Sequence, residues 1–427
     1  MHAPPRPLSG RRRCSRPLDP AGSFCYSVPS MPSRQVRASF VANYFFLFIT
    51  YAILAPYLQL YLKARGMSAS RIGLLLGSLE VAGLAGPILL GRLADRSAAY
   101  RALLAGCILV PGIAFIPMEL TTRFPLFVLC IILMGFTYRA TSPLLDSLVS
   151  RILPDPARQY GKFRIAGSVG FVLASLLFQF TSLVTGRSSL PILLAFTAAS
   201  VCTALVVATL PPSRRTGPEQ AGDARSGAHT EEQAHGLAGF DGFDGKFWAV
   251  MTVVFLGRFG IGAYYSFFSL YLQQTFPGSG VSIFWAVGAI AEIATMWFSG
   301  SLIRRWGLRV LLMVSLAAIT TRLGLFVIAP SLVVVFLTQL LHAFTFGTFH
   351  TSAVAYVNLK IGHDRRGTGM AIYNAVGIGL PSFLASAVGG FLLEAHGFVV
   401  LFLSYAAVPI AGVIVLAVFG RRLFPVS

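Results

Sequence analysis

The sequence predicts an all-α membrane protein of twelve transmembrane helices, arranged as two six-helix halves with pseudo-symmetry. Three observations lead to this fold class: a scarcity of charge, the number of apolar segments, and one long polar linker. Of the 427 residues, 55% are hydrophobic and only 11% are charged. Soluble domains carry roughly 25% charged residues. So few charges could not cover the surface of a soluble fold, so we expect an integral membrane protein.

Segments long enough to cross a bilayer, which takes roughly 20 mostly apolar residues, recur along the whole chain. Their expected bounds are 38–62, 71–93, 100–119, 124–150, 163–183, 190–210, 246–273, 280–303, 307–330, 331–357, 366–393 and 397–420. The ninth and tenth segments meet at Pro330-Ser331, which requires a tight turn.

One connection is much longer than the others. Residues 211–245 are rich in Gly, Pro and charges of both signs, which is typical of a flexible linker. This linker separates a half at 38–210 from a half at 246–421, and such repeats are the usual architecture of secondary transporters. We expect residues 1–37 to form a disordered basic tail, with Met1 and Met31 both candidate starts, and residues 422–427 a short tail.

The loop after the second segment of each half supports the repeat. GRLADRSAAYRALL (91–104) and GSLIRRWGLRVLL (300–312) each contain a glycine, then a basic cluster, then an arginine that opens the next helix. Basic residues gather in alternate short loops, so the net charge of +19 fits the positive-inside rule better than a nucleic-acid partner. Both termini are then expected in the cytoplasm, with the chain multi-pass in the inner membrane.

Motifs of cofactor and enzyme chemistry are missing from the sequence. The five cysteines form no C-x-x-C pair, and the chain has no His/Cys/Asp/Glu cluster with metal-ligand spacing. It also has no nucleophile motif and no G-x-x-x-x-G-K-[ST] loop of an ATP-driven pump. We therefore expect no metal, no cofactor and no enzymatic activity.

Several apolar segments carry ionisable residues, which are costly within a bilayer and for that reason usually functional. They are Arg139 and Asp146 in the fourth segment, Arg258 in the seventh, Glu292 in the eighth, Arg322 in the ninth, and His342 and His350 in the tenth. At about 100° per residue, the two histidines would flank one broad helix face rather than stack.

The loop from Gly91 to Arg96 resembles the signature between the second and third helices of the major facilitator superfamily. The resemblance covers the whole chain and implies the major facilitator fold. In that superfamily the loop's acidic and basic residues act in a cytoplasmic gate, which implies such a role for Gly91, Asp95 and Arg96 here.

Four further stretches narrow the resemblance. YGKFRIAGS (160–168), GAYYSFFSLYL (262–272), GAIAEI (288–293) and LHAFTFGTFH (341–350) resemble the phenylpropionate permease family, a relative of lactose permease and the oligosaccharide–proton symporters. The resemblance implies a proton-coupled transporter. Asp146 and Arg164 resemble substrate-binding residues of lactose permease, while Glu292, Arg322 and His342 resemble its proton-coupling residues.

Two positions depart from this pattern. Lactose permease has a second carboxylate three residues after the histidine, where this chain has Thr345. Threonine cannot carry a proton, so the transported proton must bind to Glu292, His342 or both. Ala166 stands where phenylpropionate-type permeases tend to have tryptophan. The departure at Thr345 weakens the assignment of a disaccharide substrate.

Polar and aromatic residues in other segments complete a plausible substrate cavity, and as candidates we name Asn43, Tyr51, Tyr265 and Asn374. A proton carrier must titrate near working pH, as histidine does with an unperturbed pKa of about 6.5. Our hypothesis is that Glu292 carries the proton and that Arg322 and His342 tune its release.

The sequence therefore predicts proton symport of a small organic solute by alternating access, in a protein that functions as a monomer. An aromatic carboxylate is one candidate solute, since several arginines lie in apolar segments. A sugar or nucleoside symporter is the alternative within the same class. A membrane sensor that keeps the fold without transport is the alternative of another class.

Overall fold

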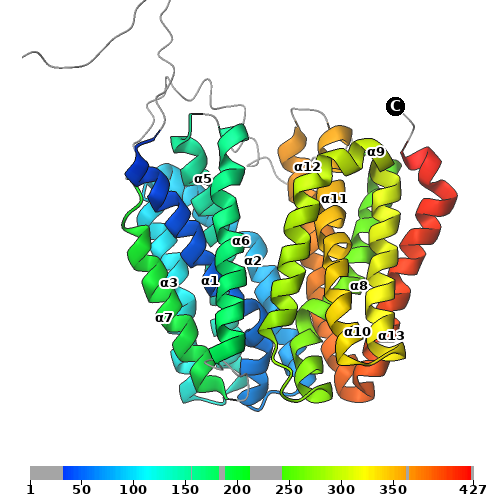
Figure 1. Cartoon of the computed structure of the whole chain (residues 1–427), viewed down its shortest axis with the longest axis horizontal. Helices are drawn as coiled ribbons and strands as arrows, with labels where there is room; N and C mark the ends of the chain where they lie inside the picture. Colours follow the sequence, from blue (N-terminus) through cyan, green and yellow to red (C-terminus); the bar gives the residue numbers. More distant parts are fainter. Residues whose placement is uncertain (1–31, 155, 182–187, 212–242, 362–364, 425–427) are drawn as a thin grey trace, which may run out of the picture.

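The computed structural model describes residues 32–154, 156–181, 188–211, 243–361 and 365–424, and within these ranges every regular element is a helix (Figure 1). The predicted tails and linker fall mostly on residues 1–31, 212–242 and 425–427, which lie outside the described residues. The first helix begins at Arg34 and the first helix after the linker at Gly245.

The helices before the linker pack together as one group, drawn from blue to green in Figure 1. Their bounds are α1 (Arg34–Ala64), α2 (Ala69–Ser97), α3 (Tyr100–Leu120), α4 (Phe124–Tyr138), α5 (Thr141–Ile152), α6 (Pro156–Thr181) and α7 (Ser189–Val207). Within this group α1 packs against α6 and α7, and α3 packs against α4 and α7. A turn at Arg139 and Ala140 separates α4 from α5 within the expected fourth span.

The helices after the linker form the second group. Their bounds are α8 (Gly245–Thr275), α9 (Ser282–Ile328), α10 (Leu332–Leu337), α11 (Phe349–Lys360), α12 (Arg366–Ile372) and α13 (Leu380–Leu423). A 3₁₀ turn, η3 (Thr338–Leu341), and a π-helix, η4 (Ala343–Thr348), join α10 to α11, and a second π-helix, η6 (Tyr373–Gly379), joins α12 to α13.

The helices α9 and α13 each break at a glycine. Gly307 has φ +73° and Gly397 has φ +77°, a backbone region that glycine enters without steric cost. These breaks coincide with the expected boundaries at 303–307 and 393–397. Among the described residues, ten helices are long and apolar enough to cross a membrane, and with the two breaks the arrangement is consistent with twelve spans.

The two groups meet at the end of the bundle away from the start of α1 and the end of α13 (Figure 1). There the Tyr57 hydroxyl lies 2.6 Å from the Ser282 hydroxyl, and the Ser70 amide donates to Glu394 at 2.8 Å. We call the segments around these contacts, residues 57–73, 179–181, 280–283 and 386–394, the closed end.

Close backbone contact between α2 and α13 makes the closed end tight. A Cβ added to Gly73 would lie 2.2 Å from the Ser386 carbonyl oxygen, and one added to Gly390 would lie 2.5 Å from the Ala69 carbonyl oxygen. Contacts this short are impossible for real side chains, so both positions need glycine in this conformation. The site described next lies between the two groups of helices.

Candidate functional site

A cavity of about 490 Å³ lies between the two groups and is lined by both. Its volume falls within the roughly 300–1,000 Å³ of small-molecule sites. Much of the wall is aromatic or aliphatic, and it includes Phe48, Leu54, Leu58, Leu76, Phe171, Trp285 and Phe346. The ionisable residues of the wall are Glu80, Arg139, Arg164, Arg258, Glu292 and His342.

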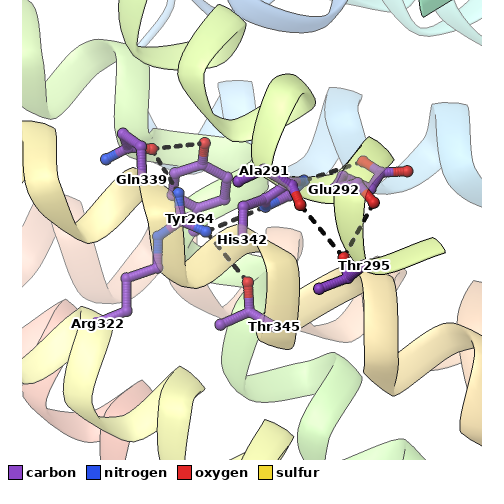
Figure 2. A network of polar contacts seen from close by, with 8 residues as sticks. All are labelled: Tyr264, Ala291, Glu292, Thr295, Arg322, Gln339, His342 and Thr345. Atoms are coloured by element: carbon purple, nitrogen blue, oxygen red, sulfur yellow. Dashed lines mark hydrogen bonds and ion pairs between the residues drawn. The ribbon is translucent and has the colours of Figure 1, made fainter. Parts of the chain in front are cut away.

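Arg322 lies behind this wall and is completely buried. Figure 2 shows its guanidinium donating to Gln339 Oε1 at 2.5 Å, to His342 Nδ1 at 3.1 Å and to Thr345 Oγ1 at 3.2 Å. The guanidinium carbon also lies 3.7 Å from the ring centroid of Tyr264. A buried cation requires partners of this kind, so Arg322 is held firmly in one position.

His342 connects Arg322 to Glu292. A guanidinium has only donors, so Nδ1 of His342 must be the acceptor and the ring proton must reside on Nε2. Nε2 lies 3.4 Å from Glu292 Oε2. The three side chains thus form a chain from Arg322 through neutral His342 to Glu292 (Figure 2). A second proton on His342 would have to occupy Nδ1 and would break its contact with Arg322.

Small residues let α9, which carries Glu292, pack closely against the tenth span, which contains η3, η4 and α11. The position of a Cβ on Gly347 is 2.3 Å from Thr295 Oγ1, and Gly288 faces the His342 side chain at 3.5 Å. The Thr295 hydroxyl in turn donates to the backbone carbonyl of Glu292 at 2.9 Å. Glu292 borders the cavity and its side chain is 25% exposed, so its carboxylate is accessible from the cavity.

The π-helix η4 corrects the expected placement of the two histidines. His342, Phe346 and His350 stack in parallel, with ring centroids 5.8 Å and 5.4 Å apart. His342 and His350 do not stack on each other, but they lie on opposite faces of the Phe346 ring in one column, a closer alignment than ideal α-helical rotation gives. The wider i→i+5 turn of a π-helix brings residues four apart nearly into line. His350 Nδ1 also lies 2.7 Å from the Tyr373 hydroxyl.

The first half contributes Arg164 to the cavity wall, while Asp146 lies beside it. Asp146 accepts hydrogen bonds from Tyr44 at 2.7 Å and from Ser142 at 3.3 Å. The Arg164 guanidinium lies over the Phe48 ring at 4.2 Å and faces Tyr44 at 5.9 Å. Among the described contacts no ion pair joins Asp146 to Arg164, and Tyr44 lies beside both.

The remaining substrate candidates divide into two groups. Tyr51 and Tyr265 line the cavity. Asn43 is buried and donates to the carbonyl oxygens of Ser39 and Val206, which ties α1 to α7. Asn374 is exposed on η6. Neither asparagine is among the residues of the cavity wall in this conformation.

Sequence reasoning missed two polar residues of this region. Glu80 on α2 forms an ion pair with Arg139 at the cavity wall, and it could have been found because it is a charge inside the second apolar segment. Gln339 accepts from both Arg322 and Tyr264. A neutral residue of this kind gave no comparable signal.

The gate candidates lie near the start of α3. Asp95 pairs with Arg151 at 2.5 Å and also accepts a hydrogen bond from Tyr100. This contact joins α2 to α5 within one half. Arg96 is exposed. A Cβ on Gly91 would have no atom within 4 Å, so this conformation does not itself require glycine there.

Residues 38–404 match the model of the MFS_1 like family. The chain belongs to this family of the major facilitator superfamily. The probable 3-phenylpropionic acid transporter of Escherichia coli K12 is 28% identical over 362 residues, covering 83% of this chain and 90% of that protein. The maltose permease of Geobacillus stearothermophilus is 27% identical over 390 residues, covering 90% and 95%.

Solved structures agree on the fold. The nucleoside transporter NupG superposes with a TM-score of 0.76 at 19% identity, covering 92% of this chain and all of that one. The xylose transporter XylE of E. coli gives a TM-score of 0.64 at 14% identity, covering 90% and 96%. The predicted family and the all-helical major facilitator fold are confirmed, the predicted count of twelve spans is consistent with the structure, and the chain is a multi-pass secondary transporter of small molecules.

Proposed function

We propose that this transporter is a proton-coupled symporter of a small organic solute, and that Glu292 is its proton carrier. The observation that supports this most strongly is the chain from Arg322 through His342 to Glu292, which ends at a cavity shared by both halves. Alternating access of that cavity would expose Glu292 first to one side of the membrane and then to the other.

The hydrogen bonds of Arg322 argue for Glu292 over His342 as the carrier. Protonating Glu292 leaves Arg322 with all three of its hydrogen-bond acceptors. Protonating His342 would remove one of these acceptors and place a second cation beside Arg322. Protonating Glu292 therefore costs less free energy than protonating His342. Arg322 and His342 tune the release of the proton by orienting the Glu292 carboxylate.

Thr345 limits the number of protons. Its hydroxyl accepts from Arg322 at the position where lactose permease has a second carboxylate, and a threonine hydroxyl does not ionise near neutral pH. One ionisable carboxylate then remains in this cluster, so we propose that one proton moves in each transport cycle.

For the solute, we propose contacts with Arg164, Asp146, Tyr51 and Tyr265, of which Asp146 would act through its neighbours. An organic acid fits the name of the E. coli relative. A sugar or nucleoside is the alternative cargo, because a maltose permease and a putative nucleoside transporter are also among the relatives. Asn43 and Asn374 have no proposed role in this conformation.

We further propose an orientation with both termini in the cytoplasm of a bacterial cell and the protein in its inner membrane, acting as a monomer and without catalysis. Basic loops support this orientation through the positive-inside rule. The closed end then faces outward, and the cavity serves the cytoplasmic side. Asp95 and Arg96, with Gly91 allowing close approach, would form the gate that closes that side by re-pairing across helices.

The variant Glu292→Gln tests the proton carrier in proteoliposomes. It should lose uphill uptake driven by a pH gradient, because glutamine cannot release a proton, and it should keep downhill exchange of labelled solute. Glu394→Gln is the matched control, since its amide oxygen can still accept from the Ser70 amide at the closed end. Undiminished uphill uptake by Glu292→Gln would refute the assignment.

A further inference from the structure

We infer that Arg258, together with Tyr265 and Ser382, forms the docking site for a carboxylate group on the transported solute. The inference rests on the proposed transport function and names the chemical class of its cargo. It begins from the fact that this arginine points into a mostly apolar cavity without a carboxylate of its own.

The arginines of this region differ in how their charge is balanced. Arg139 forms an ion pair with Glu80, and Arg322 is surrounded by Gln339, His342 and Thr345. Arg164 lies beside Asp146 through their shared neighbour Tyr44. Arg258 has no acidic partner within ion-pair distance among the described residues, and its one side-chain hydrogen bond runs from Nε to the Ser382 hydroxyl at 3.1 Å.

This geometry leaves the two terminal nitrogens of Arg258 free to bind a ligand. With Nε held by Ser382, the two terminal nitrogens carry donors in the planar fork that matches a carboxylate. The guanidinium carbon lies 4.9 Å from the ring centroid of Tyr265, which fixes the plane of the fork. An anchored, partly desolvated arginine of this kind binds an anion more strongly than a mobile surface arginine.

Tyr265 offers a further donor at the same place. Its hydroxyl is buried, and it has no hydrogen-bond partner among the described residues. Buried hydroxyls normally have a partner, and Tyr265 lines the cavity beside Arg258. A carboxylate on Arg258 could accept from this hydroxyl as well, which would satisfy both groups.

The rest of the wall suits an apolar body behind that carboxylate. Trp285 lies 6.5 Å from Tyr265 by ring centroids, and Phe48, Phe171, Leu76 and Phe346 complete the apolar lining. Among the polar uncharged groups, Ser266 and Ser386 already bond to each other at 2.7 Å. Gln59 Oε1 is buried at the same wall without a partner among the described residues, but the anchored Arg258 and the apolar surface favour a monocarboxylate with an aryl or alkyl body as the cargo class.

A carboxylate at Arg258 would also couple binding to protonation. Glu292 and Arg258 both lie near Tyr265. The other ionisable groups of this region are His342, His350 and Arg322 in the same half and Glu80, Arg139 and Arg164 across the cavity. A carboxylate bound at Arg258 and the Glu292 carboxylate would repel each other, and a proton on Glu292 would relieve this repulsion. Solute binding therefore favours a protonated Glu292, and the solute anion and one proton enter together with no change in net charge.

Isothermal titration calorimetry on the purified full-length protein tests this without any proton gradient. The probes are 3-phenylpropionate, benzoate and hexanoate, each paired with its neutral amide. Loss of charge-assisted hydrogen bonds should weaken binding of the amide about 10- to 150-fold relative to the acid. Arg258→Gln should weaken the acid by a similar factor, while Arg258→Lys, which keeps the charge but loses the fork, should fall in between.

Arg304→Gln is the matched control, since Arg304 is exposed on α9 and bonds to Ser301, and it should bind as the wild type does. Equal binding of acid and amide to wild-type protein would overturn the inference even if Arg258→Gln failed to fold. Failure of all three carboxylates to bind would also overturn it, whatever maltose or uridine does. Carboxylate binding through Arg258 with no proton movement would instead refute proton coupling and leave the inference standing.

Discussion

The backbone contact at the closed end gives a prediction whose size follows from the structure. In Gly73→Ala, the new Cβ would lie 2.2 Å from the Ser386 carbonyl oxygen and 2.9 Å from Gly390 Cα. Both atoms belong to the backbone, so no side chain can rotate away to relieve the overlap. The two helices must separate, and the variant should therefore favour the conformation in which this end is open.

Overpacking of a close contact costs about 1–3 kcal/mol. Because about 1.4 kcal/mol corresponds to a factor of ten, the ratio of closed to open molecules should fall about 5- to 150-fold. Gly106→Ala is the matched control, since a Cβ at Gly106 would meet nothing within 4 Å, and it should leave the ratio unchanged.

Double electron–electron resonance measures this ratio directly. Spin labels at Lys63 and Gln274, both exposed near the closed end in opposite halves, are attached in a background without the five native cysteines. Gly73→Ala should shift the distance distribution towards longer values. An unchanged distribution, or an equal shift in Gly106→Ala, would refute the reasoning from backbone contact.

Two further predictions concern charges in the second half. Arg322→Met should lower the free energy of unfolding by about 1–3 kcal/mol because it leaves the buried acceptors of Gln339, His342 and Thr345 without their donor; a melting temperature equal to wild type in detergent would contradict this. Hydrogen bonds from Lys360 and from the Phe247 amide hold the pKa of Asp244 below its usual value. Its charge therefore stabilises the fold at neutral pH, and the stabilisation is lost as pH falls through the folded-state pKa. Asp244→Asn keeps the helix cap, and its melting temperature should depend less on pH in the acid range than that of the wild type. An unchanged pH dependence would contradict a stabilising role for the Asp244–Lys360 pair.

Apolar length, glycine and proline positions made most of the fold predictable. The turn expected at Pro330-Ser331 lies between the end of α9 at Ile328 and the start of α10 at Leu332. The helix breaks at Gly307 and Gly397 match expected span boundaries. These features are local, so sequence spacing is sufficient to find them.

The site was only partly predictable, because its arrangement depends on helix rotation and packing. Family resemblance singled out Glu292, Arg322 and His342, which the structure brings together, but it gave no reason to include Gln339. The π-helix η4 altered the rotation assumed for His350. For Asn43 and Asn374, polarity alone did not reveal which helix face each occupies, and neither reaches the cavity wall.

The central claim is that a proton crosses the membrane with the solute by way of Glu292. It is tested most directly by a pH-sensitive dye sealed inside proteoliposomes at equal internal and external pH, with 3-phenylpropionate added outside and protein-free liposomes given the same acid as the control for passive entry of the protonated acid. The account predicts acidification of the lumen with wild-type protein and none beyond protein-free liposomes with Glu292→Gln. Solute entry through the wild-type protein with no acidification, or equal acidification with Glu292→Gln, would contradict it.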